Sequence, residues 1–379
     1  MKPKIRFKGF EGGWKAEELA HVCSVNRGVR VTRNDLHNNG IYPVYQNTDY
    51  PMGYYTKFNV ESNNPFVIVG GSAGLIGFCH TNFWAADDCV FFGDNPIINK
   101  SFLYNNLIFH KTEIKRNVRG ASVPRLDRET LRKLPVSIPS LPEQQEIASY
   151  FTTLDSQISA STSRLASLKQ MKAASLQAMF PQEGEAVPKI RFKGFEGEWK
   201  KVKADSIFKT FNEKNRPDLP VLSATQDRGM VTRESIGYNI FHDTSNEATY
   251  KHILPGQFVI HLRSFQGGFA HSEIEGIASP AYTIIDFKNK DLYHDYYWRY
   301  VFMSKEFIKR LELITYGIRD GRSISYDEFK EMSFLVPSKE EQIKIASYLK
   351  NLDRQISLQS QRLEKLKQIK SACLDKMFV

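Results

Sequence analysis

Hydrophobic residues recur with helical spacing in two long segments, near residues 140–180 and 338–379. Their apolar positions step by alternating fours and threes (Ile147, Phe151, Leu154, Ile158, Leu165 and Leu168; then Ile345, Leu349, Leu352, Ile356, Leu363 and Leu366). This spacing predicts two helices that each carry one narrow apolar seam, with Ser161 and Gln359 as its weaker positions. At a rise of about 1.5 Å per residue, each helix is expected to be roughly 57 Å long.

The two helical segments are copies of one another. Residues 139–180 and 337–378 align without a gap at an offset of 198 and agree at 23 of 42 positions. Ser140 precedes Glu143, and Ser338 precedes Glu341, at the spacing of a capping box. Because a lone seam would stay in water, the matched lengths favour an antiparallel pair of helices that buries both seams. The alternative is that each helix packs only on its own domain.

A second repeat opens each half of the chain. "PKIRFKGFEGGWK" (3–15) and "PKIRFKGFEGEWK" (188–200) match at twelve of thirteen positions. Each half is therefore a short basic opener, a long middle and a helical tail. We expect one kind of junction or partner to be met twice, and the opener at residue 3 to meet the end of the second tail. Trp14 and Trp199 are interpreted as packing anchors rather than base-stacking residues. The basic opener residues are open to phosphate or partner contacts (Arg6, Lys8, Arg191 and Lys193).

The two middles contain short apolar runs separated by glycine-rich turns. "NPFVIVG" (64–70) leads through "GSAGLIG" to "CVFFG" (89–93), and "GQFVIHLR" (256–263) leads through "SFQGGFAHS" to "SPAYTIID" (279–286). This pattern predicts a strand, a glycine-rich hairpin and a strand in both middles.

These patterns together predict an α+β fold with an approximate two-fold internal repeat. Two globular mixed α/β domains are expected at 1–139 and 188–337, and the long antiparallel coiled-coil helices at 140–180 and 338–379. Residues 181–187, rich in proline, glycine and glutamate, are the expected linker.

Several apparent catalytic motifs are incomplete. The glycine-rich turns lack the lysine of a P-loop and the following helix of a dinucleotide fingerprint. "NNPF" (63–66) lacks one proline of the amino-methyltransferase signature, and "EIK" (113–115), with Asp94 as its partner carboxylate, lacks the Pro-Asp of a metal-dependent nuclease. The four cysteines form no CxxC pair and the histidines are scattered. We therefore expect no catalytic residue, no metal site and no enzyme activity in this chain.

The net charge of +10 and pI near 9.2 favour a polyanionic partner, most commonly nucleic acid. Basic loops at 113–125 and 315–325 precede the two tails, and loops at 44–50 and 262–268 carry amides and hydroxyls. Arginine can pair with guanine, and Asn or Gln with adenine. The candidate DNA-binding residues are Gln46, Asn47, Ser72, Lys115, Arg116, Arg119, Ser122 and Arg125 in the first half, and Arg263, Ser264, Gln266, Arg319, Arg322 and Ser323 in the second. No apolar run reaches about 18 residues, so we expect a cytoplasmic protein that does not contact membranes.

The repeated segments "IPSLPEQQEIASYFTTLDSQI" and "VPSKEEQIKIASYLKNLDRQI" resemble the central and C-terminal helical regions of the specificity (S) subunits of type I restriction–modification systems. "RFKGFEGGWK", "YPVYQNTDYPMGYY" and "RSFQGGFAHSEIEGIASPAY" resemble more loosely the target-recognition domains of that family. The likeness extends over essentially the whole chain.

The resemblance implies that each target-recognition domain reads one half of an asymmetric bipartite site in double-stranded DNA, while the helices set the spacer. It also implies docking of two methylation (M) subunits and, in complete systems, of restriction (R) subunits. S-adenosylmethionine, ATP and Mg would be bound by these partners, so this chain would hold no cofactor. The alternative is a basic scaffold that binds nucleic acid without sequence preference, which predicts steep salt dependence with little discrimination.

Overall fold

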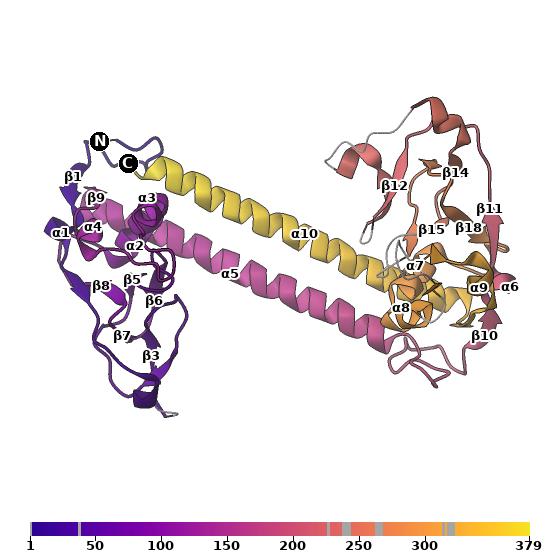
Figure 1. Ribbon diagram of the computed structural model, residues 1–379, viewed down its shortest axis with the longest axis horizontal. Helices are drawn as coiled ribbons and strands as arrows, with labels where there is room; N and C mark the ends of the chain where they lie inside the picture. The colour runs from indigo at the N-terminus through magenta and orange to yellow at the C-terminus, as the bar shows by residue number, and fades with distance from the viewer. Residues whose placement is uncertain are drawn as a thin grey trace. The chain divides into compact units, whose positions relative to one another are not determined.

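The computed structural model describes residues 2–36, 39–225, 228–236, 244–261, 268–312, 315–316 and 323–379 (Figure 1). The chain divides into two compact units. Unit 1 comprises residues 1–163 and 360–379, and unit 2 comprises residues 164–359. Each unit therefore contains one opener, one middle and part of both long helices.

Unit 1 contains three small sheets and several short helices ahead of a long helix. The largest sheet has the antiparallel order β2-β8-β5-β6, a second has the order β4-β3-β7, and β1 pairs with β9. Helix α2 packs on β5 and β6. The elements are β1 (Lys15–Glu18), α1 (Leu19–Val22), β2 (Val25–Arg27), η1 (Arg33–Asp35), β3 (Tyr42–Tyr45), β4 (Gly53–Tyr55), β5 (Asn64–Ile68), β6 (Ile76–Cys79), β7 (Trp84–Ala85), β8 (Cys89–Phe92), α2 (Lys100–Phe109), α3 (Lys111–Arg116), α4 (Arg128–Arg132), β9 (Pro135–Ile138) and α5 (Leu141–Ala178).

Unit 2 shares the four-stranded sheet and the opener strand pair of this plan, and otherwise has two-stranded pairs. Its four-stranded sheet has the order β11-β18-β15-β16, β10 pairs with β21, and α7 packs on β16. The elements are β10 (Lys200–Lys203), α6 (Ala204–Ile207), β11 (Phe208–Phe211), β12 (Leu222–Thr225), β13 (Gly229–Thr232), η2 (Arg233–Ile236), η3 (Thr244–Thr249), β14 (Lys251–Ile253), β15 (Phe258–Ile260), β16 (Phe269–His271), β17 (Gly276–Ala278), β18 (Thr283–Phe287), α7 (Asp295–Met303), α8 (Lys305–Glu312), β19 (Thr315–Tyr316), β20 (Ser323–Ile324), α9 (Tyr326–Glu331), β21 (Ser333–Val336) and α10 (Lys339–Met377).

The predicted strand, hairpin and strand are confirmed in both middles, with one correction. The partner of β5 across the hairpin is β6, which begins at Ile76 within the stretch read as a glycine-rich turn. The second predicted strand of the first middle, β8, pairs with the opposite edge of β5. β5 is thus the central strand, and its two faces pack in different buried clusters, Val67 in one and Phe66 and Ile68 in the other, so all five of its residues are buried.

The long helices α5 and α10 run antiparallel within each unit, as predicted. In unit 1, Asp155 pairs with Lys370 at 2.5 Å and the Tyr150 hydroxyl lies 3.4 Å from Cys373 Sγ. In unit 2, Lys172 pairs with Asp353 at 2.5 Å, and Ser175 and Tyr348 are joined through their hydroxyls at 3.3 Å. In both pairs of contacts the residue number rises on one helix as it falls on the other.

The seam residues also pack on their own domains. Phe151 and Leu154 of α5 belong to the same buried cluster as Leu103 of α2 and Val136 of β9, and Leu374 of α10 completes that cluster. Both predicted kinds of packing therefore occur. Each long helix begins on its own domain and also contacts the other long helix.

Candidate nucleic-acid interface

The repeated opener forms a buried junction with the first turn of each long helix. Arg6 donates from Nε and Nη2 to the two carboxylate oxygens of Glu143, both at 2.7 Å, and the Glu143 side chain is 1% exposed. Arg191 makes the same contacts with Glu341 at 2.7 and 2.8 Å. The hydrogen bond to the carboxylate raises the pKa of both arginines. These two arginines therefore bind within the fold, a role that neither of the expected alternatives, phosphate or a partner, had given them.

The capping-box prediction is only partly correct, because the two glutamate side chains bind the opener arginines. Ser338 Oγ accepts from the Glu341 backbone N–H at 3.3 Å, as a capping residue does. The carboxylates that the motif would direct to the N-cap backbone instead bind the opener arginines. Burying these carboxylates requires a strong donor, and a guanidinium in a two-point contact supplies one.

The glutamines next to these glutamates complete each junction. Gln144 accepts from the Asn99 backbone N–H at 2.9 Å and donates to carbonyls of Ile97 and Pro139. Gln342 makes the equivalent bonds, accepting from His294 at 2.9 Å. Each Glu-Gln pair thus fastens an opener and the loop before α2 or α7, which accounts for its repetition.

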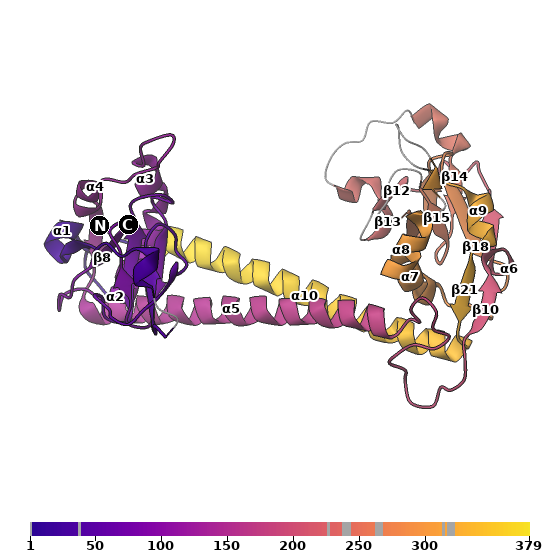
Figure 2. The ribbon, with the colours of Figure 1, turned by 60° about the horizontal axis from the view of Figure 1, so that its bottom comes forward.

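The two opener tryptophans are buried, 3% and 4% exposed, which supports their interpretation as packing anchors. Trp14 lies edge-on to Phe102 and Phe378, and Trp199 lies edge-on to Tyr297 and Phe180. The Ile5 N–H donates to the Lys376 carbonyl at 3.0 Å, so the first opener meets the end of α10 as predicted. The two ribbon views accordingly place the N and C marks side by side (Figures 1 and 2).

Unit 1 brings the candidate DNA-binding loops together. The Ser72 N–H donates to the Asn47 carbonyl at 3.1 Å, which joins the loop after β3 to the β5–β6 hairpin. Gly71, at φ +75°, lies so close to Asn47 that an added Cβ would be 2.8 Å from the Asn47 Cβ. The Gly71 N–H donates to the Pro124 carbonyl at 3.1 Å, which adds the basic loop to the same cluster.

The basic segment of unit 1 is only partly a loop. Lys115 and Arg116 lie in the last turn of α3, and the loop proper begins after Asn117. Arg119 and Arg125 close it through two backbone hydrogen bonds of 2.8 and 2.7 Å. The side chains of Asn47, Ser72, Lys115, Arg116, Arg119, Ser122 and Arg125 are exposed, and that of Gln46 is half-buried. The result is a group of amides, hydroxyls and cations on one set of adjoining loops.

The candidates in unit 2 lie mostly outside the described residues. This holds for Arg263, Ser264, Gln266, Arg319 and Arg322, and for the side chain of Ser323. The nearest described strands are β15 and β16, which match β5 and β6 in sheet order, and the antiparallel pair β19 and β20.

Sequence reasoning missed Asp87 and Asp88, which lie in the turn between β7 and β8 among the unit 1 loops. Asp88 Oδ1 lies 3.5 Å from Arg125 Nη1, and Asp87 Oδ1 lies 3.5 Å from Gln46 Nε2. The only available signal was an acidic pair, "DD", in a turn of a basic protein.

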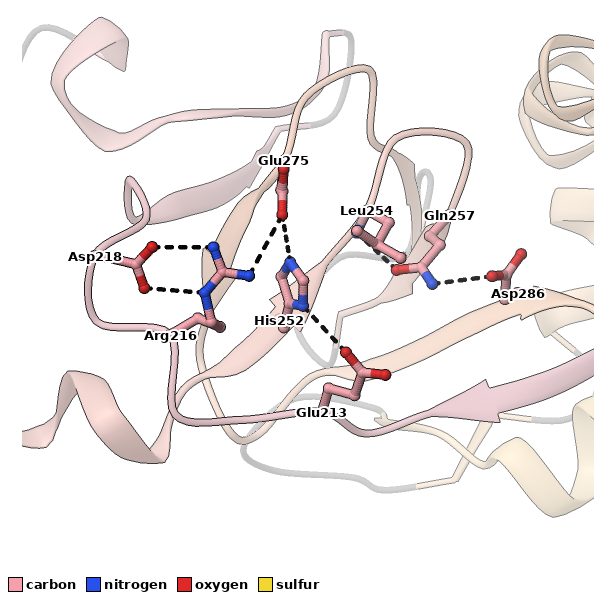
Figure 3. A network of polar contacts seen from close by, with 8 residues as sticks. All are labelled: Glu213, Arg216, Asp218, His252, Leu254, Gln257, Glu275 and Asp286. Atoms are coloured by element: carbon pink, nitrogen blue, oxygen red, sulfur yellow. Dashed lines mark hydrogen bonds and ion pairs between the residues drawn. The ribbon is translucent and has the colours of Figure 1, made fainter.

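A second polar cluster, in unit 2, has a structural role (Figure 3). His252 is 6% exposed, with Nε2 2.8 Å from Glu275 and Nδ1 3.3 Å from Glu213. Arg216 binds Asp218 through two contacts of 3.0 Å and approaches Glu275 at 3.8 Å. The His252 N–H also donates to the Glu213 carbonyl at 2.8 Å. The network therefore fastens the segment after β11 to β14.

The described residues offer little else with catalytic character. Among them no three His, Cys, Asp or Glu side chains are grouped to hold a metal ion. The cysteines are free thiols, and burial raises the pKa of Cys23 to about 11. In the described part of the chain no helix has the length and apolarity needed to span a membrane.

The fold and the paired junctions define a class of protein with two related domains, each bearing a set of loops. The family model described as "Type I restriction modification DNA specificity domain" matches residues 11–170 and 196–368. The two matches cover most of the chain, and the chain therefore belongs to this family, as the repeated helical motifs predicted.

Individual relatives give the same assignment. The chain is 22% identical over 365 residues to the type I restriction enzyme MjaVIII specificity subunit of Methanocaldococcus jannaschii, covering 89% of this chain and 85% of the relative. It is 23% identical over 209 residues to the EcoDI specificity subunit of Escherichia coli (55% and 46%), and 27% identical over 151 residues to a putative type I specificity subunit of Mycoplasma pneumoniae (38% and 41%). The last two matches thus span less than half of those relatives.

A solved structure has the same fold over the full length. The type I restriction-modification system S subunit from M. genitalium superposes with a TM-score of 0.70 at 17% identity, covering 100% of this chain and 99% of that chain.

Proposed function

We propose that this chain is the DNA sequence-specificity subunit of a type I restriction–modification complex, and that each unit reads one half of an asymmetric bipartite site. The observation that carries the proposal is the loop cluster of unit 1. There an amide loop, a glycine-rich hairpin and a basic loop adjoin through Asn47, Ser72 and Pro124. Amides suit adenine edges, arginines suit guanine, and exposed cations suit phosphates.

The difference between the two middles supports a site with different halves. The units share the order of one four-stranded sheet, since β2-β8-β5-β6 of unit 1 matches β11-β18-β15-β16 of unit 2. The sequences around the last two strands differ, however, as "GSAGLIG" and "SFQGGFAHS" show. Equivalent positions with different side chains would read different bases.

The partners follow from the repeated parts. We infer that the two junctions present equivalent surfaces to two methylation subunits, and that restriction subunits join through these. S-adenosylmethionine, ATP and Mg would then be held by the partners. The long helices would set the distance between half-sites, which lie about 34 Å apart when they are one DNA turn apart.

The test is to express this chain with its methylation subunit and to map methyladenine across the host genome. A single asymmetric bipartite motif that disappears when this chain is omitted supports the proposal. Methylation without a motif, or the same motif without this chain, overturns it. Binding that falls steeply with salt but is equal on matched and scrambled duplexes would instead support a scaffold without sequence preference.

A further inference from the structure

We propose that Asp88 is a positioning residue that holds the Arg125 guanidinium in place to read a base in the unit 1 half-site. Asp87 serves Gln46 in the same way. The inference rests on the proposed function, because it concerns how the same loops discriminate between sequences. The inference explains why two aspartates lie among basic loops that would bind the anionic DNA backbone.

The backbone of Arg125 is fixed from both sides. Its N–H donates to the Arg119 carbonyl at 2.7 Å and its carbonyl accepts from the Arg119 N–H at 2.8 Å. On the other side it forms a bridge with Gly70, and the neighbouring Leu126 N–H donates to the Val69 carbonyl at 2.9 Å. Arg125 thus projects from a short ladder of three segments, unlike the exposed residues 120–123 of the loop that it closes.

The turn that carries the aspartates is equally well anchored. The Ala86 N–H donates to the Tyr45 carbonyl at 2.9 Å, and the Asp88 carbonyl accepts from the Val69 N–H at 2.8 Å. Arg27 Nε donates to the Asp87 carbonyl at 2.7 Å. An aspartate on such a turn can fix a partner side chain, because its own backbone has little freedom.

Gly70 makes room for the Asp88 carboxylate. A Cβ at position 70 would lie 2.4 Å from both Cγ and Oδ1 of Asp88, well inside van der Waals contact. The carboxylate is therefore packed against the β5–β6 hairpin, and the Asp88 side chain is only 20% exposed. Its Oδ1 lies 3.5 Å from the Arg125 guanidinium.

The geometry favours orientation over stabilisation. Arg125 is 64% exposed and its Nη1 lies 3.5 Å from Asp88 Oδ1. Such an exposed pair contributes about 0–1 kcal/mol to stability. A guanidinium has several N–H donors in one plane, so one directed to Asp88 leaves others for the two acceptors of guanine. The negative carboxylate also opposes a phosphate at this position, which directs Arg125 to a base.

The same turn holds Gln46. Its Nε2 lies 3.5 Å from Asp87 Oδ1, at the outer limit of a hydrogen bond. With one amide hydrogen directed to Asp87, the side-chain oxygen and the other hydrogen remain for the paired donor and acceptor of adenine. Adjacent aspartates would thus orient one guanine-reading and one adenine-reading side chain.

The experiment compares Asp88→Asn with Glu61→Gln in the full chain, co-expressed with its methylation subunit. Both variants remove one negative charge from unit 1, but Glu61 is exposed and lies outside the three loops of the cluster. We expect Asp88→Asn to relax discrimination at one base pair of one half-site by roughly five- to tenfold, as loss of one oriented base contact would. The other half-site and the thermal unfolding midpoint should stay unchanged. Glu61→Gln should leave the motif intact.

A third variant separates positioning from a general effect of charge. Arg125→Gln should relax the same base pair, and the double variant with Asp88→Asn should add nothing, because both act through one contact. An unchanged motif in Asp88→Asn, equal relaxation in Glu61→Gln, or additive effects in the double variant would overturn the inference. If the unmodified chain gives no methylation motif, the proposed function is wrong. If it gives a motif that Asp88→Asn does not change, only the role of Asp88 is wrong.

Discussion

Glu143 and Glu341 show how one residue type secures the same junction twice with slightly different surroundings. In unit 1, Trp14 Nε1 donates to Glu143 Oε1 at 3.3 Å in addition to the arginine contacts. In unit 2, Trp199 Nε1 has no hydrogen-bond partner among the residues that the structure describes. The repeat has kept the ring in both places, while the polar contact differs.

This difference gives a prediction with a built-in control. Both substitutions replace the indole by a smaller phenyl ring, but Trp14→Phe also removes a hydrogen bond to a buried carboxylate, which Trp199→Phe does not. Hydrogen bonds to charged groups contribute about 1.5–3 kcal/mol, so Trp14→Phe should be the more destabilising variant by about that amount. Denaturant unfolding followed in each unit measures both. Equal losses would show that the Trp14 contact with Glu143 contributes nothing.

The cations of α3 lead to a prediction about binding rather than folding. Lys115 and Arg116 are exposed at the end of this short helix, next to the hairpin loop at Gly74. If they contact phosphates, alanine at either position should weaken binding to all duplexes alike and lower the salt slope by about one. Salt titrations on matched and scrambled duplexes check this. Arg125→Ala is the comparison variant, and it should weaken binding to matched duplexes more than binding to scrambled ones.

At the scale of elements, the long helices could be predicted closely from the sequence because their pattern is local. Fours and threes of apolar residues predict a helix wherever they occur, and α5 and α10 span Leu141–Ala178 and Lys339–Met377. The pairing of β6 with β5 was harder, because "GSAGLIG" carries both turn and strand residues. The sequence does not reveal that the strand starts at Ile76.

The site was predicted less completely, since it depends on contacts between distant segments. The amide loop and the basic loop were identified from residue type alone. The aspartates were missed because their significance lies in a neighbour 37 positions away, Arg125 beside Asp88, which no local pattern encodes. The opener arginines remained undecided for the same reason, since Glu143 lies 137 positions beyond Arg6.

The pairing of the long helices can be tested by charge exchange. Asp155 with Lys370 in unit 1 and Asp353 with Lys172 in unit 2 occupy positions that differ by 198 in both partners. Asp155→Lys should destabilise unit 1 by about 1 kcal/mol, and adding Lys370→Asp should restore most of the loss. Thermal unfolding of the single and double variants measures the coupling. No recovery in the double variant would mean that the pair is incidental.

The His252 network gives a prediction for unit 2. His252→Phe keeps the ring volume but removes both contacts to Glu213 and Glu275, so we expect a loss of about 1–3 kcal/mol. His80→Phe, at an exposed position of unit 1, should cost far less. Differential scanning calorimetry of both variants decides this, and the methylation motif should not change in either one. Similar costs would indicate that the network does not hold β14.

At the scale of the whole molecule, the two halves have similar sequences where both must form the same contacts, and different sequences where they need not. The openers and tails must form the same junction twice, and they agree at twelve of thirteen and 23 of 42 positions. The middles share the order of one four-stranded sheet, because a fold can be kept by many sequences while each set of loops serves its own target.

One junction is joined by a continuous stretch of chain and the other is not, yet both form the same backbone hydrogen bond. The Ile190 N–H donates to the Ala178 carbonyl at 2.9 Å, just as the Ile5 N–H donates to Lys376. Residues 181–187 connect the first of these pairs, yet the second forms between segments at opposite ends of the sequence. The noncovalent contacts of a junction therefore hold without residues 181–187. We expect that a protease cut at Gly184 leaves two fragments that remain associated and folded.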